Sequence, residues 1–152
     1  MIRYLSRFAI AVSFFLAACG GSDSFQPQAL SINRISASWV NTSLDERYVA
    51  RSDAEWQRVW KLHGSAALPI SQRPTFDFST TMILGVTRGS GQNGCYSLSI
   101  LRATEEETEI RVEYRESIPA LTSICTLAIV SLTDFVSIAR SEKPVTFVRV
   151  NA

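Results

Sequence analysis

The chain of 152 residues contains a single histidine, His63, so few residues are suited to acid–base chemistry. A serine hydrolase needs a base beside its nucleophile, and the strained Gly-x-Ser-x-Gly turn that presents such a serine is absent. Arg88-Gly89-Ser90-Gly91 has the right residue types but lacks the spacing. His63 falls on the apolar face of a predicted helix, where a packed histidine is the simpler interpretation. We therefore expect no catalytic residues and no enzyme, with an uncharacterised hydrolase as the alternative.

Charged residues offer three weaker possibilities. Arg88 beside the glycines could hold an anion, although a solvated arginine is the simpler interpretation. The acidic run 105–109 could attract a cation, but at hairpin spacing its carboxylates cannot easily converge. Asp77 is predicted to be half-buried and to cap a turn by accepting backbone N–H groups. No phosphate-binding loop is present, and we expect no cofactor and no metal.

The three cysteines are Cys19, Cys95 and Cys125. An odd cysteine in an exported protein needs an explanation, and lipidation of Cys19 would supply it. Cys95 and Cys125 would then face an oxidising compartment, where pairing is the usual outcome. A zinc site is the alternative, but with one histidine and no Cys-x-x-Cys motif it is disfavoured. We predict a disulfide between Cys95 and Cys125.

The N-terminus has the pattern of a targeting segment. Arg3 and Arg7 precede the apolar run 8–15, which is too short to span a bilayer. The following Leu16-Ala17-Ala18-Cys19 looks like the lipobox of a bacterial lipoprotein. Residues 1–18 are thus predicted to be a lipoprotein signal peptide, removed to leave an acylated Cys19. The alternative is an ordinary signal peptide that contains a cysteine.

Charge and targeting together limit the partners. Fifteen basic and fourteen acidic residues give a net charge of +1, which becomes −1 once Arg3 and Arg7 are removed with the leader. No basic stripe is present, so nucleic acid is not an expected partner. The predicted location is the cell envelope, with the membrane bound through the N-terminal lipid. In a Gram-negative cell Gly20, rather than Asp, after the lipidated cysteine indicates the outer membrane, facing the periplasm or the surface.

One helix is clearly predicted. Ser52-Asp53-Ala54-Glu55 is a capping box, in which the Ser52 hydroxyl accepts from the N–H of Glu55 and Glu55 reaches back. An apolar stripe follows at helical spacing, and Gly64 stands where the helix should end. The stripe comprises Trp56, Val59, Trp60 and His63. A pair of tryptophans could form a ligand platform, but this periodicity is more typical of a core face.

The remaining sequence favours short strands. They are predicted at 35–40, 47–50, 80–88, 96–103, 109–115, 127–132, 135–139 and 145–150, with a hairpin connection at 104–108. The fold class expected is α+β, a mostly antiparallel sheet of seven to eight short strands with the capped amphipathic helix packed on it. Residues 19–30 are small and polar and indicate a flexible tether. Residues 31–152 then form a single globular domain.

A glycine-rich stretch, residues 89–94, separates two of these strands. It is predicted to be a mobile loop on a rigid scaffold, and so the contact surface for a partner. The alternative is a long connector with no partner. The residues of this candidate loop are Arg88, Gly89, Ser90, Gly91, Gln92, Asn93 and Gly94.

The order of several motifs resembles the PrcB C-terminal domain family, over roughly residues 48–150. The motifs are the capped helix with Trp56 and Trp60, the run Phe76-Asp77-Phe78-Ser79 before a hydrophobic strand, Gly94-Cys95-Tyr96-Ser97, and a terminal strand containing Val145-Thr146-Phe147. This sequence departs from the family at Cys95, where a glycine is usual. It also departs at Thr133-Asp134, where Ser-Pro or Thr-Pro is common.

The resemblance implies a small exported domain, often lipid-anchored, named for an accessory subunit of a cell-surface protease complex. It carries no agreed catalytic residues. The expected function is therefore a lipid-anchored protein-binding or accessory domain with an envelope protein as partner, a protease being one candidate. The alternative is a protease inhibitor that presents the 89–94 loop to an active-site cleft.

Overall fold

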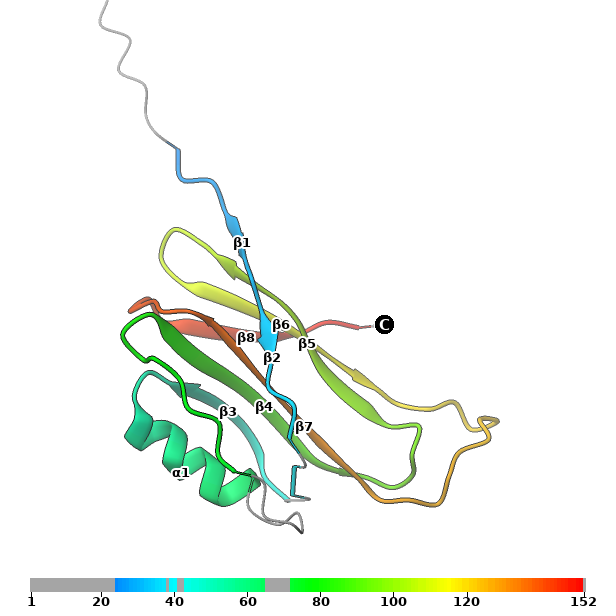
Figure 1. Ribbon diagram of the computed structural model, residues 1–152. Helices are drawn as coiled ribbons and strands as arrows, with labels where there is room; N and C mark the ends of the chain where they lie inside the picture. Colours follow the sequence, from blue (N-terminus) through cyan, green and yellow to red (C-terminus); the bar gives the residue numbers. More distant parts are fainter. Residues whose placement is uncertain (1–23, 38, 41–42, 65–71, 152) are drawn as a thin grey trace, which may run out of the picture.

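The computed structural model describes residues 24–37, 39–40, 43–64 and 72–151, and contains one helix and eight strands (Figure 1). In sequence order these are β1 (Gln28–Leu30), β2 (Asn33–Arg34), β3 (Asp45–Ala50), α1 (Asp53–His63), β4 (Thr81–Gly91), β5 (Ser97–Glu105), β6 (Ile110–Ser117), β7 (Val130–Ala139) and β8 (Val145–Arg149).

The strands form two four-stranded sheets. One has the order β2-β7-β4-β3 and carries α1 on its outer side, and we call it the helix sheet. The other, with the order β1-β5-β6-β8, is the open sheet. Neighbouring strands pair antiparallel, with the exception of β6 and β8, which are parallel. The α+β class is confirmed, whereas the division of the strands between two sheets was not predicted.

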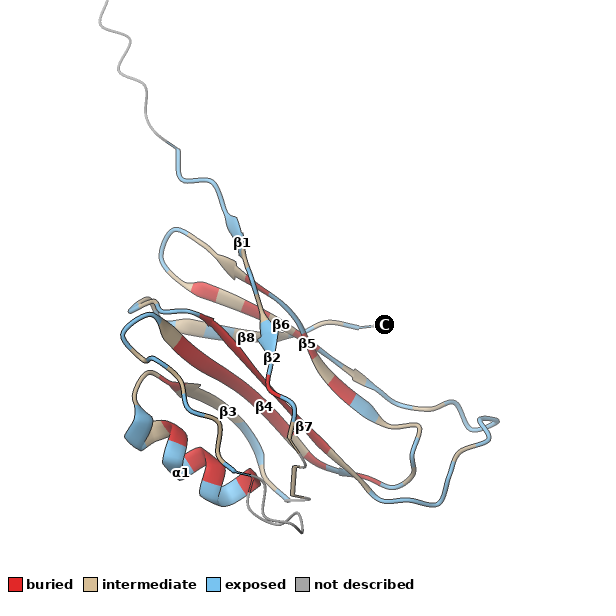
Figure 2. Cartoon of the chain, viewed as in Figure 1, coloured by how far each residue is buried: buried red, intermediate tan, exposed pale blue. Residues whose placement is uncertain are grey.

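The main core lies between the sheets. Alternate residues of β4 and β7 face residues of β5 and β6. Strands β4 and β7 are buried along most of their length (Figure 2). The core side chains are Met82, Leu84, Val86, Leu98, Ile100, Ala103, Ile110, Val112, Tyr114, Leu132, Val136 and Ile138. A bulge between Ile100 and Arg102 shifts the alternation of β5 by one residue, so Ile100 and Ala103 both face inward.

A second core lies between the helix sheet and α1. The Ser52 hydroxyl accepts from the N–H of Glu55, and the Glu55 carboxylate accepts from the N–H of Arg51, so both predicted halves of the cap exist. Gly64 ends the helix, its N–H donating to Trp60 O at 2.8 Å. The whole predicted stripe is buried.

Phe135 is the centre of this second core. Its ring lies 4.7 Å from that of Trp39 and 5.7 Å from that of Trp56. Gly85, on the adjacent strand, leaves the space for the ring, because a Cβ there would lie 2.0 Å from a Phe135 ring carbon. The helix therefore meets the sheet through an aromatic layer, and we expect core packing, rather than ligand binding, to account for the two helix tryptophans.

A buried carboxylate, that of Asp134, lies between the sheets, and this residue is 4% exposed. Its carboxylate accepts from the N–H of Ile100 at 2.7 Å and from the guanidinium of Arg34. Arg34 also donates to Ile100 O at 3.1 Å. Strand β1 pairs with β5 only from Ala103 onward, so these two side chains satisfy backbone groups that no neighbouring strand reaches.

Several strand predictions need correction. The described part of the strand predicted at 35–40, residues 35–37 and 39–40, is not in a strand, and Asn33–Arg34 pairs with β7 instead. Ile35 and Trp39 face the second core. The runs predicted at 127–132 and 135–139 are one strand, β7, which begins at Val130 and continues through Thr133 and Asp134. The last residues of the predicted tether form β1, which pairs with β5.

We predict that Asp134→Ala lowers the free energy of unfolding by about 1–3 kcal/mol, since it leaves the Ile100 N–H buried without an acceptor. Asp134→Asn keeps an oxygen acceptor at the same place and should cost less. Urea unfolding followed by tryptophan fluorescence measures both. Equal losses in the two variants would show that the N–H···O bond is not what stabilises this site.

Candidate functional site

The first half of the stretch 89–94 is strand rather than loop. Strand β4 extends to Gly91, and its register with β7 shifts between Thr87 and Ser90. Gly89, with φ of 84°, forms this bulge, because a positive φ suits glycine. Only residues 92–96 connect β4 to β5. The glycines thus bend a strand and allow close packing, and the prediction that all of 89–94 is a mobile loop is wrong.

The short connection 92–96 is fixed to the segment that follows β6. The predicted disulfide is confirmed: Cys95 and Cys125 are bonded, with their Cα atoms 5.5 Å apart. The Gly94 N–H donates to Thr126 O at 3.0 Å, and a Cβ at Gly94 would lie 2.1 Å from Thr126 Oγ1. We call residues 92–96 and 118–129 together the stapled tip.

The stapled tip exposes aliphatic side chains. Leu121, Ile124 and Leu127 are 106%, 100% and 97% exposed. Ile118 and Ile129 are also exposed. No residue from Ser117 to Val130 is charged, nor is any aromatic. Part of this run was predicted to be a strand because its apolar content is typical of one. Such a group of exposed apolar side chains is typical of an interaction surface.

The stapled tip lies at the far end of the sandwich from the point where the polypeptide enters it (Figure 1). Strand β1 starts beside Glu105, at the end of β5 opposite to Ser97. A nine-residue strand such as β5 spans about 30 Å. Entry point and stapled tip are therefore separated by the length of the sheet.

Arg88 is neither solvated nor free to hold an anion. Its guanidinium pairs with Asp45 and, at 3.2 Å, with Glu116, whose side chain is 9% exposed. Burial alone would lower the pKa of Arg88, but these two carboxylates raise it. Arg88 therefore joins β4 to the neighbouring strands.

The acidic residues have structural partners. Asp77 is exposed, not half-buried, but it does cap a turn: its carboxylate accepts from the N–H and hydroxyl of Ser79, and these bonds lower its pKa. Glu105 pairs with Lys143 at 2.9 Å. Within the described ranges, no three His, Cys, Asp or Glu side chains gather as they would around a metal ion.

His63, the last residue of α1, is fully buried on the inner face of the helix. Its Nε2 lies 2.8 Å from the Tyr48 hydroxyl, which in turn donates to the Glu46 carboxylate. Nδ1 is buried without a hydrogen-bond partner among the described residues. Burial lowers the pKa of His63, and the Glu46 charge offsets this only in part. The imidazole is therefore a packed side chain of the second core, with no solvent-exposed surface.

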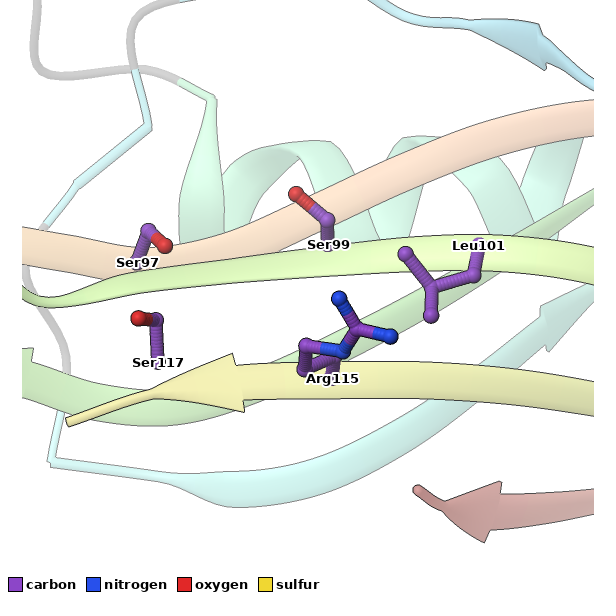
Figure 3. A pocket seen from close by; sticks show the side chains of 5 residues that line it. All are labelled: Ser97, Ser99, Leu101, Arg115 and Ser117. Atoms are coloured by element: carbon purple, nitrogen blue, oxygen red, sulfur yellow. The ribbon is translucent and has the colours of Figure 1, made fainter. Parts of the chain in front are cut away.

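Described residues line two surface hollows that bear on function. One, of about 270 Å³, is on the outer face of the open sheet and is lined by Ser97, Ser99, Leu101, Arg115 and Ser117 (Figure 3). The other, of about 290 Å³, lies between α1 and β3 and is lined by Tyr48, Val49, Glu55, Arg58, Val59 and Leu62. None of these residues was predicted to form a site, since serines alternating along strands indicate only a solvated face.

No protein-family model, curated protein or solved structure matches this sequence. Cys19 and the lipobox before it lie outside the described residues. Among the helices of the described residues, none has the length and hydrophobicity needed to cross a membrane.

We predict that acid destabilises the fold through His63. Because its pKa is lower in the folded protein, the unfolded protein binds more protons below about pH 6.5. The free energy of unfolding should then fall as pH drops from about 6.5 to the folded-state pKa. His63 is the only histidine, so His63→Gln should remove this dependence. Urea unfolding of both proteins between about pH 7 and 5 tests this. Parallel pH profiles would contradict it.

Proposed function

We propose that this protein is a lipid-anchored component of the bacterial cell envelope that binds a partner protein through its stapled tip. The observation that carries this proposal is the group of exposed aliphatic side chains on a loop that a disulfide holds in place. A fixed loop loses less conformational entropy on binding than a free one. Exposed leucine and isoleucine side chains stabilise a complex when the partner removes them from water.

A protein partner is favoured over the lipid surface for two reasons. Loops that enter membranes typically carry basic or aromatic residues, and the run 117–130 has neither. The anchor would also enter at the opposite end of the sandwich. The stretch from Cys19 to Pro27 reaches at most about 30 Å, so an upright domain presents the tip away from the leaflet that holds the lipid.

The resemblance to the PrcB C-terminal domain family supports an accessory role, with a protease as one possible partner. The motifs that carry the resemblance include Gly94-Cys95-Tyr96, which lies in the stapled tip. The proposal does not require the partner to be a protease.

The second candidate function, a protease inhibitor presenting residues 89–94, is less favoured by the geometry. Ser90 and Gly91 pair with Ser131 and Val130, so their backbone is already engaged in the sheet. Only residues 92–96 could enter a cleft, and the disulfide joins them to the apolar loop.

We predict that a photo-crosslinker placed at Leu121 or Leu127 in intact cells captures a discrete partner protein. Both side chains point into solvent, so the probe should not disturb the fold. The matched control is the same probe at Gln57, which is exposed on α1. Mass spectrometry identifies the product. Identical products from all three sites, or none from the tip, would contradict the proposal.

A triple variant, Leu121→Ser, Ile124→Ser and Leu127→Ser, separates binding from folding. The three side chains are fully exposed, so the free energy of unfolding should change by less than about 0.5 kcal/mol per residue. Affinity for the captured partner should fall by at least about tenfold, since each buried aliphatic side chain contributes about 1.5–3 kcal/mol. An unchanged affinity would place the binding surface elsewhere.

We further predict that Cys19→Ser abolishes membrane association. Each CH₂ of an acyl chain contributes about 0.8 kcal/mol on insertion into the membrane. Without acyl chains, the protein should move to the aqueous phase of a detergent partition. Cys125→Ser is the control: it also removes a cysteine, but should leave partitioning and lipid mass unchanged. Detergent-phase recovery of Cys19→Ser equal to that of the wild type would overturn the lipoprotein proposal.

A further inference from the structure

The outer face of the open sheet carries an arginine surrounded by hydroxyl groups. In the β5–β6 ladder, Ser97 is paired with Ser117 and Ser99 with Arg115. Directly paired residues hold their Cβ atoms about 4.5–5.5 Å apart. Figure 3 shows the Arg115 guanidinium directed from β6 toward β5, near Ser99 and Leu101. The five lining residues thus form one hollow rather than separate surface groups.

Arg115 differs from the other arginines on this face. Glu113, the acid on the same face of β6, already binds Arg102 at 2.8 Å and Arg111 at 3.4 Å. The bond from Arg102, followed by that from Arg111, lowers the pKa of Glu113, so the carboxylate is charged and engaged. In the part of the protein that the structure describes, the Arg115 side chain forms no ion pair or hydrogen bond. Arg102 and Arg111 therefore share the Glu113 carboxylate, while the positive charge of Arg115 lies at the hollow.

We propose that this hollow binds a carboxylate group. A guanidinium presents two parallel N–H donors that match the two carboxylate oxygens. The three serine hydroxyls can donate further hydrogen bonds, and Leu101 gives an apolar wall for the carbon atoms next to the carboxylate. A volume of about 270 Å³ suits a single functional group more than a whole small-molecule ligand. Phosphate or sulfate would leave the Leu101 wall without a contact.

The carboxylate belongs to the partner of the stapled tip, and in this respect the inference rests on the proposed function. Ser117 lines the hollow and is followed directly by Ile118, the first exposed aliphatic residue of the tip. A polypeptide that covers the tip can thus place an acidic group in the hollow. An Asp or Glu side chain and the C-terminus of a polypeptide both provide the same carboxylate chemistry.

Titration of the full-length protein in a neutral detergent with short peptides tests the site directly. The probes are acetyl-Ala-Leu with a free C-terminus, its C-terminal amide, and an amidated peptide with an internal glutamate. The readout is the NMR resonance of Arg115 Nε, assigned by its loss in Arg115→Lys. We expect saturable shifts with one or both of the peptides that carry a carboxylate, and no shift with the amide. The peptide that binds shows whether the site takes a C-terminal or a side-chain carboxylate.

The matched variants are Arg115→Gln and Arg111→Gln, which remove one charge each from the same face of β6. Arg115→Gln should weaken peptide binding by at least about tenfold, as expected when a hydrogen bond to a charged group is lost. Its binding is followed by the amide resonances of Ser99 and Ser117. Arg111→Gln should change affinity by less than about twofold, since a screened surface charge contributes little.

Three outcomes would overturn the carboxylate site: equal binding of acid and amide, equal weakening in the two variants, or tighter binding of inorganic phosphate at the same ionic strength. None of them bears on crosslinking from Leu121 or Leu127, so the failure of this site and the failure of the proposed function are distinguishable.

Discussion

The buried carboxylate of Asp134 joins the two sheets, because it lies on β7 and binds a backbone group of β5. It lies on β7 between the core residues Leu132 and Val136, and it accepts from the N–H of Ile100 on β5. A charge in an apolar interior is costly unless it is paired and hydrogen-bonded. Here Arg34 pairs with the carboxylate and also donates to Ile100 O. The N–H and the C=O of Ile100 therefore both have hydrogen-bond partners. The contact therefore ties β5 of the open sheet to β7 of the helix sheet at Ile100.

The next residue, Phe135, organises the other side of the same strand. Its ring points toward α1 and contacts the rings of Trp39, Trp56 and His63, with centroids 4.7, 5.7 and 5.9 Å away. Successive residues of a strand face opposite sides. From the same strand, Asp134 therefore contacts the open sheet and Phe135 contacts α1. The order of the layers, open sheet, helix sheet and helix, follows from these two side chains.

Sequence patterns correctly predicted the features that follow from residue spacing or from residue counts. The capping box, the helical stripe and the cysteine count identified α1 and the disulfide, because each involves a pattern that can be counted. Asp134 was missed because Thr133-Asp134 has the composition of a turn, and its partners on β2 and β5 are far away in the sequence. The glycines of 89–94 were predicted to form a mobile loop because composition does not show whether a glycine provides backbone flexibility or allows close packing. The apolar residues 118–129 were assigned in part to a buried strand, since hydrophobicity does not reveal which side chains remain exposed.

The short strand β1 has a mechanical consequence. It runs antiparallel to β5 for three residue pairs, Gln28 to Leu30, and its free end points away from the stapled tip. A pull on the residues before Gln28, against a load held at the tip, acts along the strands rather than across them. The β1–β5 bonds are then loaded together in shear, instead of opening one after another from an end. Because the disulfide joins Cys125 to Cys95, tension applied to the segment 118–129 reaches β5 through Cys95 and Tyr96 and bypasses residues 92–94.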